Sequence, residues 1–315
     1  MVPSLIQPAL AAEGLPWSDA PFRLDWMRGI DGQLALTSRA IAYGDQRLTD
    51  TAARAQLENG ELTIEQLDGG SFGGQVGFSG KLSALAEGAP KLSAKLSLVD
   101  AKLSLVDAKL PDLRPKPASV DLPEGILNLD LDVTAEGGSQ AEMIRTLGGT
   151  GTVKMRDGAV AGFDIDRIAS RLDRADTQKE LNELLTKSMA GGQTRIDRLA
   201  GALRIDKGVI GTDDLTATTP NADMTGTGSA DLANWTLDLA LSIRLSMEAD
   251  LPVFGLTLTG PLGRPQRTLD AKALIGKLEQ RASDSNRRRA AEVSPNSNPL
   301  PPNTVIVPVQ PAPAR

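Results

Sequence analysis

Apolar and polar residues alternate along most of this chain, and the longest stretch of alternation lies between residues 199 and 265. One parity of its last run holds only large apolar side chains: Trp235, Leu237, Leu239, Leu241, Ile243 and Leu245. The other parity is mostly polar. A period of two predicts a strand with one apolar face and one solvated face. A strand of about ten residues is roughly 33 Å long, so its apolar face requires a partner surface or an apolar ligand.

A second clean run of the same kind lies at residues 126–133. Its apolar parity consists of Leu127, Leu129, Leu131 and Val133. Upstream, residues 22–26 and 33–38 predict a pair of strands, and further short runs follow to about residue 82. Turn signals such as Asn59-Gly60 separate them, which indicates an antiparallel meander. We expect a strand over 151–156 that turns at Asp157-Gly158, and the last strand over 251–260.

Three segments carry helical patterns instead. Between Asp164 and Met189, leucines and isoleucines recur at steps of three and four, and Gly191-Gly192 follows. The polar stretch 173–179 predicts a break that divides this helix in two. Ser139 is suited to begin a short helix at 139–147 by capping its N-terminus, and residues 269–282 predict another. An amphipathic helix of this kind most often covers the end of a sheet.

An exact tandem copy occupies residues 96–109, where the sequence Leu-Ser-Leu-Val-Asp-Ala-Lys appears twice. Because seven is odd, a continuous strand would place the leucines of the two copies on opposite faces. A bulge or a turn between the copies would restore the register. On a helix, the same spacing would instead align one apolar stripe. We favour strands with a bulge or hairpin, because alternation continues on both sides.

Together these patterns predict a mainly β protein with a few helices, in which a long curved antiparallel sheet forms an open groove capped by an amphipathic helix. Residues 1–16 are expected to be a flexible segment, and 17–282 one domain. Within it, 17–113 form a repeat-like part, and a proline-rich loop near 114–124 leads into a C-terminal part, 114–282. From residue 283 onward, polar residues and prolines predict a disordered tail.

The composition narrows the chemistry that the chain can perform. It contains no cysteine and no histidine, which removes thiol nucleophiles, histidine bases and the usual zinc ligands. Acids such as Asp130, Asp132 and Asp238 alternate with apolar residues, as expected of a solvated strand face. We therefore predict no catalytic residues, no metal site and no cofactor. The net charge of −6 also argues against nucleic acid as a partner.

The sequence shows no hydrophobic segment of the kind that spans a membrane. No run approaches the ~20 apolar residues that cross a bilayer. The opening thirteen residues lack a positively charged start and contain two prolines, so they resemble a signal peptide poorly. Two expectations follow: a cytosolic chain, or one whose targeting segment lies upstream of Met1.

Several motifs, taken in order, resemble the C-terminal region of the AsmA family. They are residues 146–151, 157–164, 194–199, 207–209, 226–232, 251–253 and 259–265, preceded by 17–21, 60–67 and 72–74. The resemblance covers roughly residues 17–274. It implies a periplasmic protein associated with the inner membrane of Gram-negative bacteria. It also implies a gutter-shaped β body of the bridge-like lipid transfer group, linked to phospholipid movement and outer-membrane homeostasis, with phospholipid and possible inner- and outer-membrane proteins as partners.

Physical reasoning and this resemblance lead to the same candidate site, because an apolar strand face is a suitable surface for hydrocarbon. The candidate lining residues are Leu127, Leu129, Leu131, Val133, Trp235, Leu237, Leu239, Leu241, Leu256 and Leu258. The alternative for each of them is an ordinary packed core. At the level of function, the alternative is a structural or assembly factor for outer-membrane proteins that acts through exposed strand edges.

Overall fold

The computed structural model describes residues 17–43, 46–84, 88–103, 124–174, 177–247 and 250–293. Thirteen strands form one open sheet in which each strand pairs with the next in the sequence, and the pairings are antiparallel. This confirms the predicted fold class. The strands are β1 (Gly32–Tyr43), β2 (Gln46–Glu58), β3 (Glu61–Ser71), β4 (Gly74–Ser83), β5 (Lys91–Leu103), β6 (Glu124–Glu136), β7 (Gly148–Ala161), β8 (Gln193–Asp206), β9 (Val209–Thr218), β10 (Ala222–Asp231), β11 (Thr236–Leu245), β12 (Phe254–Pro261) and β13 (Gln266–Asp270).

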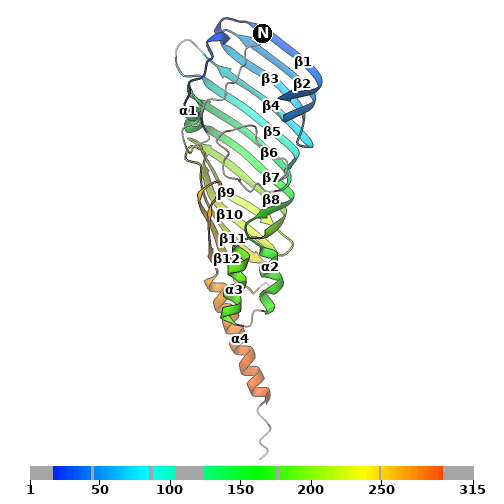
Figure 1. The fold of residues 1–315 in the computed structure, drawn as a ribbon, viewed down its shortest axis with the longest axis vertical. Helices are drawn as coiled ribbons and strands as arrows, with labels where there is room; N and C mark the ends of the chain where they lie inside the picture. The colour runs from blue at the N-terminus through cyan, green and yellow to red at the C-terminus, as the bar shows by residue number, and fades with distance from the viewer. Residues whose placement is uncertain are drawn as a thin grey trace, which may run out of the picture.

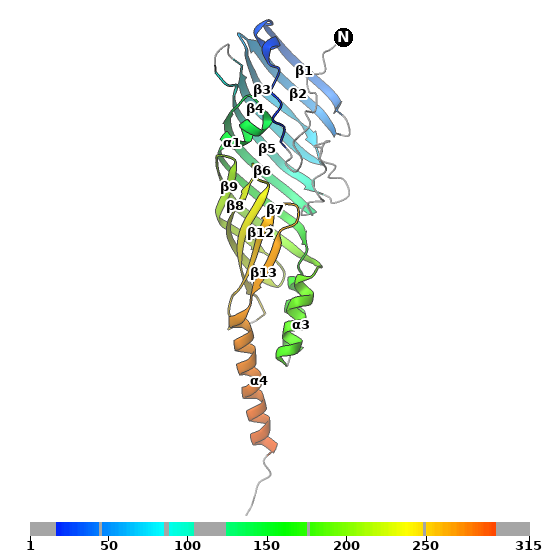
Figure 2. The same cartoon turned by 60° about the vertical axis from the view of Figure 1, so that its left-hand side comes forward.

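The sheet is elongated, and its strands cross the long axis diagonally (Figure 1). β1 lies at one end, and β12 lies near the other together with helices α2 (Ile165–Arg171) and α3 (Gln178–Met189). Helix α4 (Lys272–Val293) projects beyond that end. In the second view, β12 and β13 pass in front of β7 and β8 (Figure 2). The half of the sheet that starts at β7 is therefore strongly curled.

Strand register keeps apolar side chains together on one face. Leu96 on β5 lies opposite Leu131 on β6, and Leu129 lies opposite Val153 on β7. The intervening positions pair polar residues, such as Lys95 with Asp132. Because side chains alternate in direction along a strand, the sheet has one apolar and one polar face. We call these the apolar face and the polar face.

A bulge in β5 explains how the tandem copy fits into the sheet. The pairing with β6 shifts between Leu98 and Ala101, and Asp100 adopts a left-handed conformation (φ 54°). The extra residue brings Ala101 and Leu103 to the same face as Leu96 and Leu98. The first copy is thus a strand with a bulge, as favoured from the sequence. Most of the second copy, residues 104–109, lies outside the described residues, as does most of the predicted loop at 114–124.

The predicted helices form, with the break where it was expected. Helix α1 (Gln140–Thr146) begins at Ser139, whose side chain accepts a hydrogen bond from the Glu142 N–H. Helix α2 is capped by Asp164 and continues into a short 3₁₀ turn, η2 (Leu172–Arg174). Helix α3 starts with a complete capping box between Thr177 and Glu180. Capping satisfies backbone N–H groups that a helix leaves without partners.

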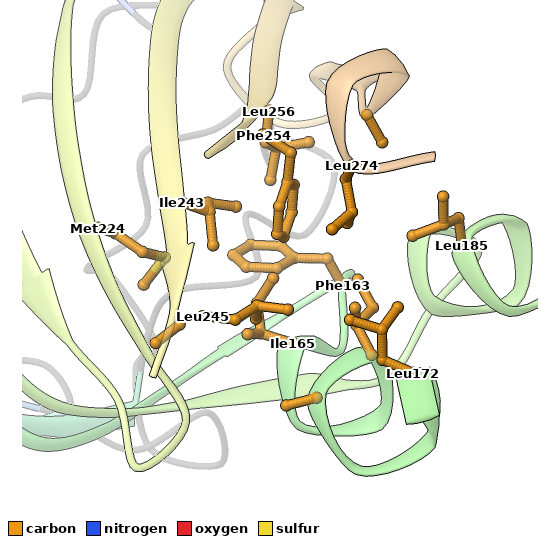
Figure 3. Packing of buried hydrophobic residues seen from close by; sticks show 14 of the residues in the cluster. Phe163, Ile165, Leu172, Leu185, Met224, Ile243, Leu245, Phe254, Leu256 and Leu274 are labelled. Atoms are coloured by element: carbon orange, nitrogen blue, oxygen red, sulfur yellow. The ribbon is translucent and has the colours of Figure 1, made fainter. Parts of the chain in front are cut away.

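The packed core lies at the curled end of the molecule. Figure 3 shows side chains from β10, β11, β12, α3 and α4 converging with those of the segment 163–172 around Phe163 and Phe254. Ile165, Ile243 and Leu274 are fully buried there. The apolar face of the curled strands and the helices therefore seal one another at this end.

Three sequence predictions about strand boundaries are wrong. Residues 22–26 do not form a strand, because Asp25–Arg28 folds as a 3₁₀ turn, η1, that buries Met27 completely. The chain does not turn at Asp157-Gly158: β7 continues to Ala161, and Asp157 takes a positive φ of 52° within it. Gly260 and Pro261 do not end the sheet, because β13 follows β12.

The C-terminal boundaries also differ from the prediction. Helix α4 runs to Val293, well past the expected end at Ala282. The first eleven residues of the stretch expected to be disordered, 283–293, are thus helical. Residues 294–315 lie outside the described part of the chain, as do residues 1–16.

The N-terminal segment 17–29, which we call the N-terminal strap, follows one rim of the sheet. The Trp17 indole donates a 2.6 Å hydrogen bond to the Leu232 carbonyl, beyond β10. The Phe22 N–H donates to the Gly138 carbonyl beside α1, and Arg28 donates to the Ala84 carbonyl after β4. The strap therefore connects strand ends that are far apart in the sheet.

Candidate functional site

Register places nine of the ten candidate lining residues on the apolar face. Four lie on β6, three on β11 and two on β12, while Trp235 lies in the turn before β11. Register places Leu239 opposite Leu258 and Leu241 opposite Leu256. β6 and β11 are separated by four strands in the sheet order. The candidates are therefore parts of one continuous surface rather than one compact cluster.

Burial of these residues changes along the sheet. The leucines of β6 are half-buried, as are Leu237 and Leu239 on β11. Leu256 is 0% exposed within the packed core, and Leu241 and Leu258 pack against that core. The apolar face is thus partly accessible around β6 and closed where α2, α3 and α4 meet β12. We call its half-buried portion, between β3 and β11, the trough.

Sequence reasoning missed several residues of the trough. They are half-buried, share the apolar face by register, and come from β4, β5, β7 and β8: Val76, Phe78, Leu96, Leu98, Val153 and Leu203. The same period-two signal was present at each of these positions. The signal is weak there because the runs are short or rich in glycine, and small residues occupy some of the positions among the large apolar ones.

The polar face carries the charged residues in cross-strand pairs. Lys95 Nζ lies 2.9 Å from the Asp132 carboxylate, and this hydrogen bond and charge raise the pKa of Lys95. Arg156 lies 2.9 Å from Asp100, and its pKa is raised by that hydrogen bond. These pairs are exposed, so each contributes little to stability. They keep the polar face hydrated.

A hollow of about 1250 Å³ also lies along the polar face, lined by residues from β3 to β10. Acids and bases mix on its wall, including Asp68, Asp130, Lys95 and Arg204. Asp130 accepts a hydrogen bond from the Ser97 hydroxyl, and Lys95 pairs with Asp132. These pairs neutralise part of the charge on the wall of the hollow.

Two kinds of feature are absent from the described residues. Among them, no group of three or more acidic side chains is arranged to hold a metal ion. No helix within the described ranges combines the length and the hydropathy needed to cross a bilayer. The candidate site is therefore the trough, whose side chains present mostly aliphatic and aromatic carbon.

Comparisons with known proteins give one family model and one curated relative for this chain. A model of the AsmA family matches residues 8–215, about two-thirds of the chain. Protein AsmA of Escherichia coli (strain K12) is 22% identical over 219 residues, which cover 70% of this chain and 34% of that protein. The chain thus spans about a third of the length of this curated relative. No solved structure matches this chain.

Proposed function

Because the chain belongs to the AsmA family, we propose that it binds phospholipid acyl chains in the trough and contributes to lipid transport and outer-membrane assembly in the bacterial envelope. The observation that carries the proposal is the continuity of the apolar face. From β3 to β11, neighbouring strands place mostly Leu, Ile, Val, Phe, Met or Ala side chains, interspersed with glycine and a few Ser or Thr, on the same side of the sheet.

Hydrocarbon is the ligand class that such a surface favours. Removing apolar surface from water stabilises by about 25 cal/mol per Å², and an acyl chain has no polar group that requires a partner. The half-buried state of Leu127, Leu129 and Leu131 leaves surface that a ligand can cover. Fully packed core residues such as Ile243 offer none.

The membranes on either side of the periplasm supply the proposed ligand, and inner- and outer-membrane proteins are the proposed partners. Nucleic acid is not among them, because the chain is acidic overall. Directional transfer would require partners at both membranes. The trough itself would shelter the chains from water in between.

A charge placed in the trough tests this proposal. Leu129→Asp puts a carboxylate between Leu98 and Val153, its neighbours across the two adjacent strands. Burying an unpaired carboxylate under hydrocarbon is costly, so we expect the lipid that co-purifies with the protein to fall by about tenfold or more. The measurement is mass spectrometry of lipid extracted after detergent-free purification, together with transfer between liposomes.

The matched control is Thr152→Asp, which adds the same charge to an exposed position of the polar face on β7. This variant should carry as much lipid as the unaltered chain. Equal lipid content in both variants, or unaltered protein that carries no lipid and transfers none, would refute acyl-chain binding in the trough.

The edge of β1 supports a second candidate function, that of an assembly factor that pairs with another strand. β1 ends the sheet order, and Leu34 and Leu36 on it are 56% and 39% exposed. Unpaired strand edges bind extended segments through backbone hydrogen bonds. Replacing the exposed Thr37 by Lys would place a charge on this edge, which disfavours pairing with another strand, and should leave lipid content unchanged. Binding assays on that variant therefore separate the two functions.

A further inference from the structure

We propose that Arg267 is the headgroup site of the trough and binds the phosphate of a phospholipid. This inference rests on the proposed function and names the chemistry of its ligand. It begins from the composition of the apolar face. From β3 to β13, the side chains that register and burial together place on this face are Leu, Ile, Val, Phe, Met, Ala, Gly, Ser and Thr, and Arg267 is the one charged residue among them in the described strands. Near Asp157, where a positive φ interrupts the alternation, Gly158 and Ile196 are buried and the charged neighbours are exposed.

Register fixes the position of Arg267 relative to the trough. It lies opposite Leu258 on β12, and Leu258 lies opposite Leu239 on β11. Adjacent strands are about 4.8 Å apart, so Arg267 is about 10 Å from Leu239 along this row. An acyl chain lying on Leu239 would bring its own phosphate within reach of the arginine.

The next pair of opposed apolar residues on β12 and β13 lies in the packed core. Leu269, two residues beyond Arg267, lies opposite Leu256, which is 0% exposed. The arginine therefore stands at the boundary between the accessible trough and its sealed end. A lipid lying in the trough would meet a cation where the apolar surface stops being available.

Gly162 provides space for the guanidinium. It follows β7, six strands from β13 in the sheet order, yet a Cβ at this glycine would lie 2.1 Å from Nη2 and 2.4 Å from Cζ of Arg267. The curl of the sheet thus brings the arginine head against the backbone at the end of β7. Any side chain at position 162 would displace it, and the φ of Gly162, 100°, is one that other residues rarely adopt.

The charge of Arg267 is available to a ligand. The residue is exposed, and within the described parts of the chain its guanidinium makes no hydrogen bond or ion pair. A guanidinium donates paired N–H groups in a planar fork that matches phosphate oxygens, and it always carries its charge. The geometry therefore suits a phosphate monoanion held at the end of an apolar surface.

The test compares two lipids that share the same acyl chains. The full chain is incubated with mixed vesicles of phosphatidylglycerol and diacylglycerol, and the lipid bound per protein is measured by extraction and mass spectrometry. Arg267→Gln should lower the ratio of bound phosphatidylglycerol to bound diacylglycerol by about tenfold, the effect of losing one charge-assisted contact. Arg267→Lys, which keeps the charge and loses the fork, should fall in between.

Arg244→Gln is the matched control, because Arg244 is an exposed arginine on the polar face of β11. It should leave the ratio unchanged. Raising the salt concentration with the unaltered chain provides a second measurement that needs no variant: binding of phosphatidylglycerol should weaken, and that of diacylglycerol should not. Charged residues on edge strands also commonly prevent edge-to-edge aggregation. If Arg267 had only that role, Arg267→Gln would not change the lipid ratio.

The possible results distinguish failure of the proposed function from failure of the headgroup site. Unaltered protein that binds neither lipid refutes the proposed function. Protein that binds both lipids with a ratio insensitive to Arg267→Gln and to salt refutes the headgroup site alone. An equal loss of both lipids in Arg267→Gln makes the residue structural and also overturns the site. Displacement of phosphatidylglycerol by inorganic phosphate would assign the arginine to a free anion instead of a lipid headgroup.

Discussion

At the scale of single residues, glycines on the apolar face allow the sheet to curl. A Cβ at Gly151 would lie 2.5 Å from Cδ2 of Leu131, and one at Gly226 would lie 2.6 Å from Cδ2 of Leu241. Each leucine lies opposite its glycine on the adjacent strand. The leucines therefore occupy the space above the glycines. Side chains on the inner side of a curled sheet are crowded, so small residues there permit tighter curvature.

Gly228 gives the sharpest test of this idea. A Cβ at this position would lie 2.3 Å from the Asp238 carbonyl oxygen, which is backbone and cannot move independently. Gly228→Ala should therefore lower the free energy of unfolding by roughly 1–3 kcal/mol through overpacking, measured by urea denaturation. Gly255→Ala on β12 is the control, because its closest neighbour would be 3.8 Å away. Equal stability of both variants would show that the glycines do not set the curvature.

At the scale of elements, α2 and α3 act as one unit that closes the curled end of the sheet. Glycines bound this unit: Gly162 precedes α2 and Gly192 follows α3, both with positive φ, and the N–H of Gly162 donates to the carbonyl of Gly192. Between them, Ile165, Ile168 and Leu181 are almost completely buried. Burying a large aliphatic side chain contributes roughly 1.5–3 kcal/mol, so this unit is held firmly by its apolar side.

Shortening one buried side chain of α3 should reveal that contribution. Leu181 is 1% exposed in the core, and Leu181→Ala is expected to cost about 2–5 kcal/mol of stability through lost burial and a cavity. Lys179→Ala, at an exposed position of the same helix, should change stability by about 0.5 kcal/mol or less. Hydrogen exchange of α2 and α3 measures both. Unchanged protection in Leu181→Ala would mean that the helices are not anchored through this face.

At the scale of the whole molecule, the N-terminal strap ties distant parts of one rim together. The Trp17 ring lies edge-on to Trp235, with centroids 5.9 Å apart, and its indole N–H binds the Leu232 carbonyl. At its other end, Arg28 reaches the Ala84 carbonyl. Strands from both halves of the sheet are thereby linked through a segment that belongs to neither.

Removal of Trp17 should loosen this link. Trp17→Ala deletes a half-buried aromatic ring and its hydrogen bond, and we expect a loss of roughly 2 kcal/mol, below the 3–5 kcal/mol of a fully buried aromatic. Trp26→Ala is the control, since Trp26 is 41% exposed. Thermal unfolding compares the two. A smaller effect at Trp17 than at Trp26 would show that the Trp17 end of the strap does not hold the rim.

Much of the architecture could be predicted from the sequence because its signals are local. The alternation at 236–245 and the cap at Ser139 depend on residues close together in the chain, and the structure confirms the elements they predict. The predicted turn at Asp157-Gly158 is wrong because residues distant in the chain decide the structure of this segment. Its Asp-Gly pair is a turn signal, but β6 and β8 pair with β7 on both sides of it, and tertiary pairing overrides that local preference.

By itself, the sequence determined that the sheet has one apolar and one polar face, since a period of two fixes the side of every residue within a strand. Only the tertiary structure decided which apolar residues stay accessible and which are sealed. Leu239 and Leu256 carry the same local signal, yet one is half-buried and the other has no exposed surface. The physical reason is that burial depends on the curl of the sheet and on α2, α3 and α4, elements distant in sequence that close over one end of a face.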